Sequence, residues 1–413
     1  MEEIKRIINN IDFEGLENVL VGNMLHYILG VKNKKAIFSL VSACFFTSYN
    51  FSVQGNVKTL CFTASGENER KDQAIAFKNV VNLIDDRIIM MPEKKRVSLV
   101  GLKNVMKILH WNKKLKQIPI GITERIVLLN SMFRAYITYE LFDINKRKNS
   151  WKIKNLVTFC DVLTTDYLFL SKLKNECNIT VTLQHGAYPI SSNKWAYYGS
   201  KSDVFLVDSQ HSADCALLSG YKGKTIVVGS MHNIDRCFYE RKTNEKDVIG
   251  VFCNSEMHPR EDNIEMIRVV EAFCRKTEKK AFIKLHPTNK IAEFQQIIDK
   301  DISTICEKGK SIDDFVEEIS IAVIGVSTVF TNMLTKHIPA FLFFREGFDQ
   351  NLYLNSDDVK FSTVSQLETL ISKIGTNELN AVIDKYRDYF LVEGDIKGNY
   401  ERVFKEIGIN NDK

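Results

Sequence analysis

Residues 281–287 read Ala-Phe-Ile-Lys-Leu-His-Pro, and residues 321–334 read Ile-Ala-Val-Ile-Gly-Val-Ser-Thr-Val-Phe-Thr-Asn-Met-Leu. The first run is apolar and ends in a histidine and a proline, which predicts a buried strand with His286 at its C-terminal tip. The second run predicts a strand, a tight turn and a helix that begins near Ser327 and Thr328. Free N–H groups and hydroxyls at such a turn favour anion binding, so this stretch is suited to the phosphates of a nucleotide.

The region before this stretch repeats the same rhythm of strand and helix. Its apolar runs do not alternate with polar residues, and helical patterns separate them, which indicates a parallel sheet covered on both faces. Polar residues at the ends of the runs would line one edge, where open α/β sheets bind ligands. We therefore expect an α/β protein with two Rossmann-like domains facing each other across a cleft. The runs are residues 156–160, 179–183, 203–207 and 224–228.

Composition agrees with a globular chain of two domains: 413 residues, 45% hydrophobic and 26% charged. A polar stretch at residues 243–247 is the predicted boundary. The expected parts are an N-terminal Rossmann-like domain, a second Rossmann-like domain, and terminal helices that pack back across both. These parts cover residues 1–242, 247–377 and 378–413.

The N-terminal domain has a less regular pattern. Lys34 to Thr47 and residues 57–64 are candidate strands, and residues 87–91 form a short strand that ends at Pro92. Residues 99–142 are mainly helical, with a break at residues 118–121.

Three motifs together resemble a known family. They are Lys284-Leu285-His286-Pro287, Gly325-Val326-Ser327-Thr328 and, upstream, Gln184-His185-Gly186. The combination resembles bacterial surface-polysaccharide glycosyltransferases of GT-B architecture, among them the sialyl-, polysialyl- and Kdo-transferases and the glycerophosphotransferases of teichoic acid synthesis. The likeness covers roughly residues 155–345. In that family the His-Pro and Ser/Thr motifs hold the phosphate of a CMP- or CDP-activated donor.

The resemblance implies a donor site and a catalytic base. The donor site would comprise His286, Pro287, Lys284, Ser327, Thr328 and Gly325. Each has a structural alternative, since a histidine can cap a strand end and Ser327 and Thr328 can be ordinary N-caps.

Two residues compete for the role of general base in the N-terminal domain. His185 follows a predicted strand, and an imidazole with a free pKa near 6.5 suits the task. A histidine in a similar motif is thought to act this way in the glycerophosphotransferases, whereas many of the sialyltransferases use an aspartate, for which Asp161 is the candidate. The acidic motif of those sialyltransferases is absent from this sequence.

A further group of polar residues follows the first strand of the second domain. Asn254, Glu256 and His258 are therefore candidate cleft residues. Residues 299–301 read Asp-Lys-Asp but lie in a polar connection, so we expect no metal site. The sequence has no GxGxxG or P-loop motif, and we expect no cofactor besides the donor substrate.

Charge is distributed unevenly along the chain. Residues 94–154 hold 15 lysines and arginines and three acids, whereas the whole chain has a net charge of only +5. Such a block favours an anionic partner, such as a membrane face, a lipid-linked acceptor or an acidic glycan, although solvated helix faces give the same pattern. Nucleic acid is not expected, because no binding motif accompanies the block.

Location follows from three further features. The nine cysteines have no CxxC spacing, which favours buried thiols in a reducing compartment. The first residues lack the apolar core of a signal peptide, and no apolar run is long enough to span a bilayer. We expect a cytoplasmic protein, peripheral to the inner face of the plasma membrane.

The sequence thus predicts a glycosyltransferase that moves a sugar from a nucleotide-activated donor to a capsular or lipopolysaccharide-type glycan. A CMP-sugar is the favoured donor and a UDP-sugar the other candidate, with metal-independent, inverting transfer. Three alternatives stay open: a CDP-polyol phosphotransferase, a sugar-nucleotide epimerase, and a non-catalytic scaffold at the membrane surface.

Overall fold

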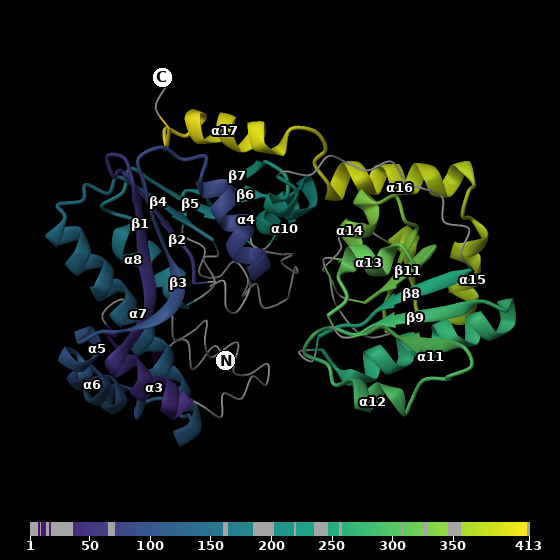
Figure 1. The fold of residues 1–413 in the computed structure, drawn as a ribbon, viewed down its shortest axis with the longest axis horizontal. Coiled ribbons are helices and arrows are strands. Elements are labelled where there is room, and N and C mark those ends of the chain that lie inside the picture. Colours follow the sequence, from purple (N-terminus) through teal and green to yellow (C-terminus); the bar gives the residue numbers. More distant parts are fainter. Residues whose placement is uncertain are drawn as a thin grey trace.

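Two sheets and their covering helices make up the computed structural model of the chain (Figure 1). The structure describes residues 7–8, 10–13, 16–17, 36–64, 71–159, 164–184, 202–218, 220–234, 247–255, 258–307, 309–325, 327, 329–345 and 357–410.

The first sheet has the strand order β1-β3-β2-β4-β5-β6-β7. All neighbours are parallel except β1 and β3. Helices from the βα units pack beside the strands, and α3, α5, α6 and α7 form a helical group at one end (Figure 1). The strands are β1 Phe46–Gln54, β2 Thr59–Phe62, β3 Arg87–Val97, β4 Asn155–Thr158, β5 Ile179–Leu183, β6 Val204–Val207 and β7 Lys224–Val227. The helices are α3 Ala36–Phe45, α4 Lys71–Val81, α5 Val100–Lys103, α6 Val105–Leu115, α7 Ile122–Lys148, α8 Thr164–Leu173, α10 Gln210–Leu218 and η1 Met231–Asn233.

The second sheet is parallel throughout, in the order β10-β9-β8-β11-β12-β13. In chain order this is 3-2-1-4-5-6, the arrangement of a dinucleotide-binding Rossmann sheet. Its strands are β8 Val248–Phe252, β9 Lys280–Lys284, β10 Ser303–Ile305, β11 Ile321–Ile324, β12 Ala340–Phe343 and β13 Lys360–Phe361. Its helices are α11 Arg260–Thr277, α12 Ile291–Gln295, α13 Ile312–Val316, α14 Val329–Thr335, η2 Asp357–Val359 and α15 Val364–Ser372. These two sheets confirm the α/β prediction with two Rossmann-like units.

The two terminal helices are α16 Asn377–Phe390 and α17 Ile396–Glu406. Helix α16 lies over the second unit and α17 over the first, both on the same side of the molecule (Figure 1). Helix α16 packs on α14 and also contacts α10, where the Phe390 ring lies 4.3 Å from the ring of His211. In the same contact, the hydroxyl of Tyr389 donates to Asp214 Oδ2 at 2.8 Å. Helix α17 packs on the first sheet, and the hydroxyl of Tyr400 donates to the carbonyl of Gly229 at 3.2 Å. The predicted boundary at residues 243–247 lies mostly outside the described residues, so the domain limits stay predictions.

The expectation of a strand from Lys34 to Thr47 was wrong for most of its length. Residues 36–45 form α3, and strand β1 begins only at Phe46. Leu40, Ala43 and Cys44 recur at helical spacing and pack in one core cluster with residues of α7. An unalternating apolar run fits a buried strand or a helix, and here the long neighbouring helix α7 decides in favour of the helix.

The strand that was expected to end at Pro92 continues to Val97. Strand β3 pairs with β2 only from Arg87 to Met90, whereas its other edge pairs with β1 from Arg87 to Pro92 and again, after an irregularity, at Arg96 and Val97. Pro92 therefore lies where one side of the strand has no partner strand among the described residues, and a missing N–H is tolerated there. The helical pattern from residue 99 to 142 with a break before α7 is confirmed.

Each sheet has its own apolar core. The seven cysteines in the described part of the chain are free, and six of them are buried. Among the described residues, no helix is both long and apolar enough to cross a bilayer.

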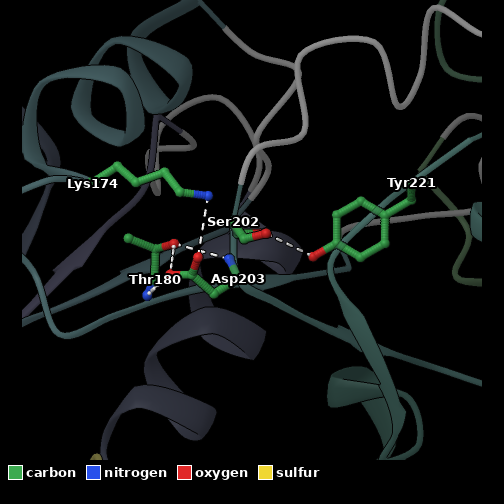
Figure 2. Close-up of polar contacts among 5 residues, drawn as sticks. All are labelled: Lys174, Thr180, Ser202, Asp203 and Tyr221. Atoms are coloured by element: carbon green, nitrogen blue, oxygen red, sulfur yellow. Dashed lines mark hydrogen bonds and ion pairs between the residues drawn. The ribbon is translucent and has the colours of Figure 1, made fainter.

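A polar network ties together the N-terminal ends of β5 and β6 (Figure 2). Asp203 Oδ2 accepts hydrogen bonds from the backbone N–H of Thr180 at 2.9 Å and from its hydroxyl at 2.7 Å, and Lys174 lies 3.1 Å from Oδ1. Beside it, the hydroxyl of Tyr221 donates to the carbonyl of Ser202 at 3.0 Å. These contacts stabilise the amino ends of β5 and β6, at the side of the first sheet opposite to the carboxyl ends of its strands.

Candidate functional site

The candidate site lies at the carboxyl ends of the strands of the second sheet. Strands β8 and β11 are neighbours, paired as far as Phe252 and Ile324, although the chain leaves them toward opposite edges of the sheet. This is the topological switch point, the place where open α/β sheets leave a crevice for a ligand.

Asn254 and Gly325 meet at this point. The Asn254 residue is buried, with 4% of its surface exposed, and its amide lies over Gly325. A Cβ atom at position 325 would lie 2.2 Å from Asn254 Oδ1. Only glycine leaves room for the amide at this distance. The residues that follow β8 and β11 are therefore packed directly against each other.

Two more asparagines hold the backbone of Asn254. Its N–H donates to Asn263 Oδ1 at 2.7 Å, and its carbonyl accepts from Asn263 Nδ2 at 3.0 Å and from Asn289 Nδ2 at 2.9 Å. Asn263 lies in α11 and Asn289 follows β9. The backbone N–H and carbonyl of Asn254 therefore link the loop after β8 to α11 and to the loop after β9. The sequence analysis did not single out Asn263 or Asn289, and their spacing of 9 and 35 residues from Asn254 gave no periodic signal.

His286 follows β9 and is exposed at the same edge. Its Nδ1 accepts the backbone N–H of Thr288 at 3.3 Å and lies 2.8 Å from the Thr288 hydroxyl. With Nδ1 accepting, the neutral ring carries its hydrogen on Nε2, which is then able to donate to an anion.

His258 is half-buried in the loop between β8 and α11. Burial lowers the pKa of His258 below its ordinary value; Asp262 opposes this and the nearby His286 adds to it. The lowered pKa favours the neutral ring, and His286, from another strand end, contributes to the shift.

An ion pair closes one side of this edge. Arg345, which follows β12, lies 3.2 Å from Asp262 Oδ1, and only 7% of the Asp262 side chain is exposed. Burial raises the pKa of Asp262, and Arg345 and His258 oppose the rise. Arg345 was not expected from the sequence, although its position just after a buried strand is the same signal that identified His286.

Ser327 and Lys284, two other predicted donor-site residues, make ordinary structural contacts. Ser327 Oγ accepts the backbone N–H of Val329 at 3.3 Å, as an N-cap does. Lys284 donates to the carbonyl of Lys310, and its ammonium lies 5.6 Å from the centre of the Phe315 ring. Pro287 is exposed next to His286. The donor-binding role of all of them stays a prediction.

A pocket of about 150 Å³ opens between the loops that follow β8 and β9. It is lined by Ser255, His258, Arg260, Asn263, Thr288, Asn289, Lys290, Glu293 and Phe294. Arg260 and Lys290 lie 3.8 Å and 3.2 Å from the carboxylate of Glu293, so the wall holds two cations, one carboxylate and one imidazole. The space is large enough for one phosphate group with its waters. No group of three or more metal-ligating side chains occurs in the part of the chain that the structure describes.

Four predicted residues lie outside the described residues: His185, Asp161, Glu256 and Thr328. Of the Gln-His-Gly motif on the first sheet, the described residues include Gln184, at the end of β5. Its Oε1 accepts the N–H of Asp208 at 2.8 Å and its Nε2 donates to Ser212 at 2.9 Å. The expected cleft between the two sheets stays a prediction.

Two solved structures have a similar fold over most of their length. A Listeria monocytogenes protein assigned as UDP-N-acetylglucosamine 2-epimerase has a TM-score of 0.52 at 10% identity, covering 87% of this chain and 98% of that one. The Methanocaldococcus jannaschii UDP-GlcNAc 2-epimerase, in complex with UDP-GlcNAc and UDP, has a TM-score of 0.50 at 12% identity, covering 84% and 99%. No protein-family model matches the sequence, and no curated protein matches it either. At these identities the likeness concerns architecture, and the chain has the two-domain GT-B fold.

Proposed function

We propose that the chain is a glycosyltransferase that binds the phosphates of a nucleotide-activated sugar at the carboxyl-end edge of its second sheet. The observation that carries this proposal is the convergence at the switch point, where Asn254 packs on Gly325 and where His258 lines a pocket together with Thr288, the hydrogen-bond partner of the His286 ring. Nucleotides bind at this position in open α/β sheets.

Each group has a role in this reaction. The Nε2–H of His286 donates to a donor phosphate and stabilises the charge that develops on the departing nucleotide. Gly325 leaves room for the Asn254 amide and so shapes the turn at which the phosphate binds, and the Ser327 hydroxyl adds a donor there. Lys284 and Pro287 support the turn that presents His286, and Thr328 adds a second hydroxyl.

The acceptor hydroxyl needs a base from the first sheet. His185 and Asp161 remain the two candidates, since both follow strands of that sheet in sequence. As in the family that the motifs resemble, transfer would invert the anomeric carbon and need no metal, and the acceptor would be a capsular or lipopolysaccharide-type glycan. A CMP-sugar is the favoured donor.

A second candidate is epimerisation of a sugar nucleotide. Both structures compared above are UDP-N-acetylglucosamine 2-epimerases in which almost the whole chain aligns with this one. An epimerase needs no acceptor, so the two reactions differ in what consumes the donor.

The first experiment measures thermal stability with CMP, CDP, UDP and GDP. We expect cytidine nucleotides to raise the melting temperature, and His286→Ala to weaken binding about 10- to 100-fold, the loss expected for one hydrogen bond to a charged group. The matched control is His337→Asn. His337 has a left-handed backbone conformation with φ 54°, which asparagine tolerates, and it precedes β12 at the amino ends of the strands, away from the candidate site. A response to UDP alone would instead favour the second candidate or a UDP-dependent transferase.

The second experiment follows the bound nucleotide sugar by chromatography. Release of free nucleotide that depends on an added glycan supports transfer, while conversion to another sugar nucleotide without acceptor supports epimerisation. Transfer of a polyol phosphate from a CDP-polyol would favour the phosphotransferase alternative. The absence of stabilisation by any nucleotide would overturn the proposal and leave a non-catalytic scaffold.

A further inference from the structure

An exposed apolar surface covers the helical end of the first unit, far from the candidate donor site. It is formed by α3, α5 and α6, which lie together at one corner of the molecule (Figure 1). We call it the α3–α6 face and define it by the outward side chains of Phe38, Val41, Leu99, Leu102, Met106 and Leu109.

The exposure of these side chains is unusual for a helical surface. Phe38 is 80% exposed, Met106 68% and Leu109 61%. Met106 and Leu109 are three residues apart on one side of α6, and Leu102 lies in α5 just before that helix; we call these three residues the stripe. A surface helix of a globular protein normally turns charged residues outward on that side.

Helix α5 is in direct contact with both α3 and α6. A Cβ atom at Gly101 would lie 2.2 Å from the carbonyl oxygen of Ala43, so α5 rests on the backbone of α3. The inner side of α6 is anchored separately, because Trp111 is fully buried and meets the Tyr136 ring edge-on at 5.4 Å. The outward residues are thus presented by a rigid support.

Lysines surround the stripe, and carboxylates are absent from it. Residues 98–123 contain five lysines and no aspartate or glutamate, and α3 contains no charged residue. Lys107 and Lys114 turn back onto the rings of Tyr136 and Phe13. Lys103, Lys113 and Lys116 are exposed beside the stripe.

The geometry points to a docking surface for an anionic lipid bilayer. Apolar side chains on a rigid face would insert at the boundary between headgroups and acyl chains, and the lysines would meet the lipid phosphates. A protein partner with this much apolar area would need its own acidic rim, whereas a bilayer supplies both components. This surface deepens the proposed function, on which its purpose rests, since it would hold the chain where a lipid-linked acceptor is found.

The test is co-sedimentation of the full chain with vesicles of phosphatidylcholine alone and of a two-to-one mixture with phosphatidylglycerol. We expect binding to the anionic vesicles, and weaker binding as salt is added. Lys103→Gln, Lys113→Gln and Lys116→Gln together should weaken it about a hundredfold, because each lysine near an anionic surface contributes about fivefold. Leu102→Ser, Met106→Ser and Leu109→Ser together should weaken it at least about tenfold.

Matched controls use the same substitutions on other exposed surfaces. Lys300→Gln, Lys385→Gln and Lys397→Gln remove the same charge, and Leu217→Ser with Leu218→Ser removes exposed apolar area from α10. We expect both control variants to bind the vesicles as the parent chain does. Equal losses in control and test variants would show that net charge or general hydrophobicity is responsible, and would overturn the specific surface.

Three other results would overturn the inference. The parent chain would fail to bind anionic vesicles; it would form a dimer without lipid that the serine variant abolishes; or the serine variant would lose thermal stability without lipid, which would mean that another part of the chain covers the face. Nucleotide-dependent stabilisation of the same variants separates the two proposals. If it persists while vesicle binding fails, only the docking surface is wrong, and the reverse result leaves the surface standing without the donor site.

Discussion

Asn254 Oδ1 occupies the space that a side chain at Gly325 would need, since a Cβ atom there would lie 2.2 Å from it. These two residues end neighbouring strands that the chain leaves in opposite directions. Because Asn263 holds both backbone polar groups of Asn254, the backbone of this residue cannot shift away from Gly325 without breaking buried hydrogen bonds.

The first prediction concerns Gly325→Ala. The backbone at this position does not have a positive φ, so the added methyl group is the main disturbance. We expect it to lower the free energy of unfolding by about 1–3 kcal/mol, the range for overpacking a tight site, and to weaken nucleotide binding. Urea unfolding and a nucleotide titration measure the two effects.

A double-mutant cycle with Asn254→Ala tests the cause. If the amide is the obstacle, Gly325→Ala should be nearly neutral once Asn254 has been shortened, giving a coupling energy of at least about 1 kcal/mol. Additive losses in the double variant would contradict the steric explanation.

The second prediction concerns pH and His258. Its pKa is lowered in the folded protein, mainly by burial, whereas the unfolded chain binds this proton near the ordinary value of 6.5. Below that pH the unfolded state carries more protons, so this residue's contribution to stability is complete above pH 6.5 and is lost as the pH falls toward the folded pKa. His258→Gln should flatten this part of the stability curve.

The measurement compares the free energy of unfolding in urea at about pH 7.5 and about pH 5.5, where we expect its slope against pH to be shallower for His258→Gln than for the parent chain. His110→Gln, which alters an exposed histidine on α6, is the control and should leave the slope unchanged. Identical slopes for the parent chain and His258→Gln would contradict the prediction.

The carboxyl ends of the strands in the second sheet could be predicted from the sequence, because apolar runs end abruptly there at polar residues. This identified His286, Gly325 and Asn254, which the structure brings to one edge of the sheet. It could not reveal Asn263, because a helix residue that hydrogen-bonds to a loop nine positions earlier leaves no pattern in hydrophobicity. Long-range packing could not be predicted either, since α3 shares an apolar core with α7, which lies far along the chain.

Asp208 shows another limit of sequence reading. It follows β6 just as Asp161 follows β4, and nothing in the sequence separates the two. In the structure, burial raises the pKa of Asp208 to about 7, while a hydrogen bond from Ser230 opposes the rise. Among the described residues, no partner meets its buried Oδ1 atom.

The third prediction compares Asp208→Asn with Asp203→Asn, two aspartates at opposite ends of β6. Asp208 holds its proton in the folded state up to about pH 7 and loses it near pH 3.8 when unfolded, so its contribution to stability is present below pH 3.8 and disappears as the pH rises through 7. Removing the charge should therefore stabilise the protein at about pH 8, by about 2 kcal/mol, and have little effect at about pH 4.

Asp203 should respond with the opposite sign. Although burial alone would raise its pKa, the bonds from Thr180 and Lys174 outweigh this and hold the pKa below the ordinary value (Figure 2). Its ionised form stabilises the fold above pH 3.8, so Asp203→Asn should destabilise the protein at about pH 8 and lose that effect in acid. Thermal unfolding of both variants at the two pH values tests this prediction. If both substitutions changed the melting temperature in the same direction at about pH 8, the prediction would be wrong. A shared loss of packing, rather than the charge at each end of β6, would then control stability there.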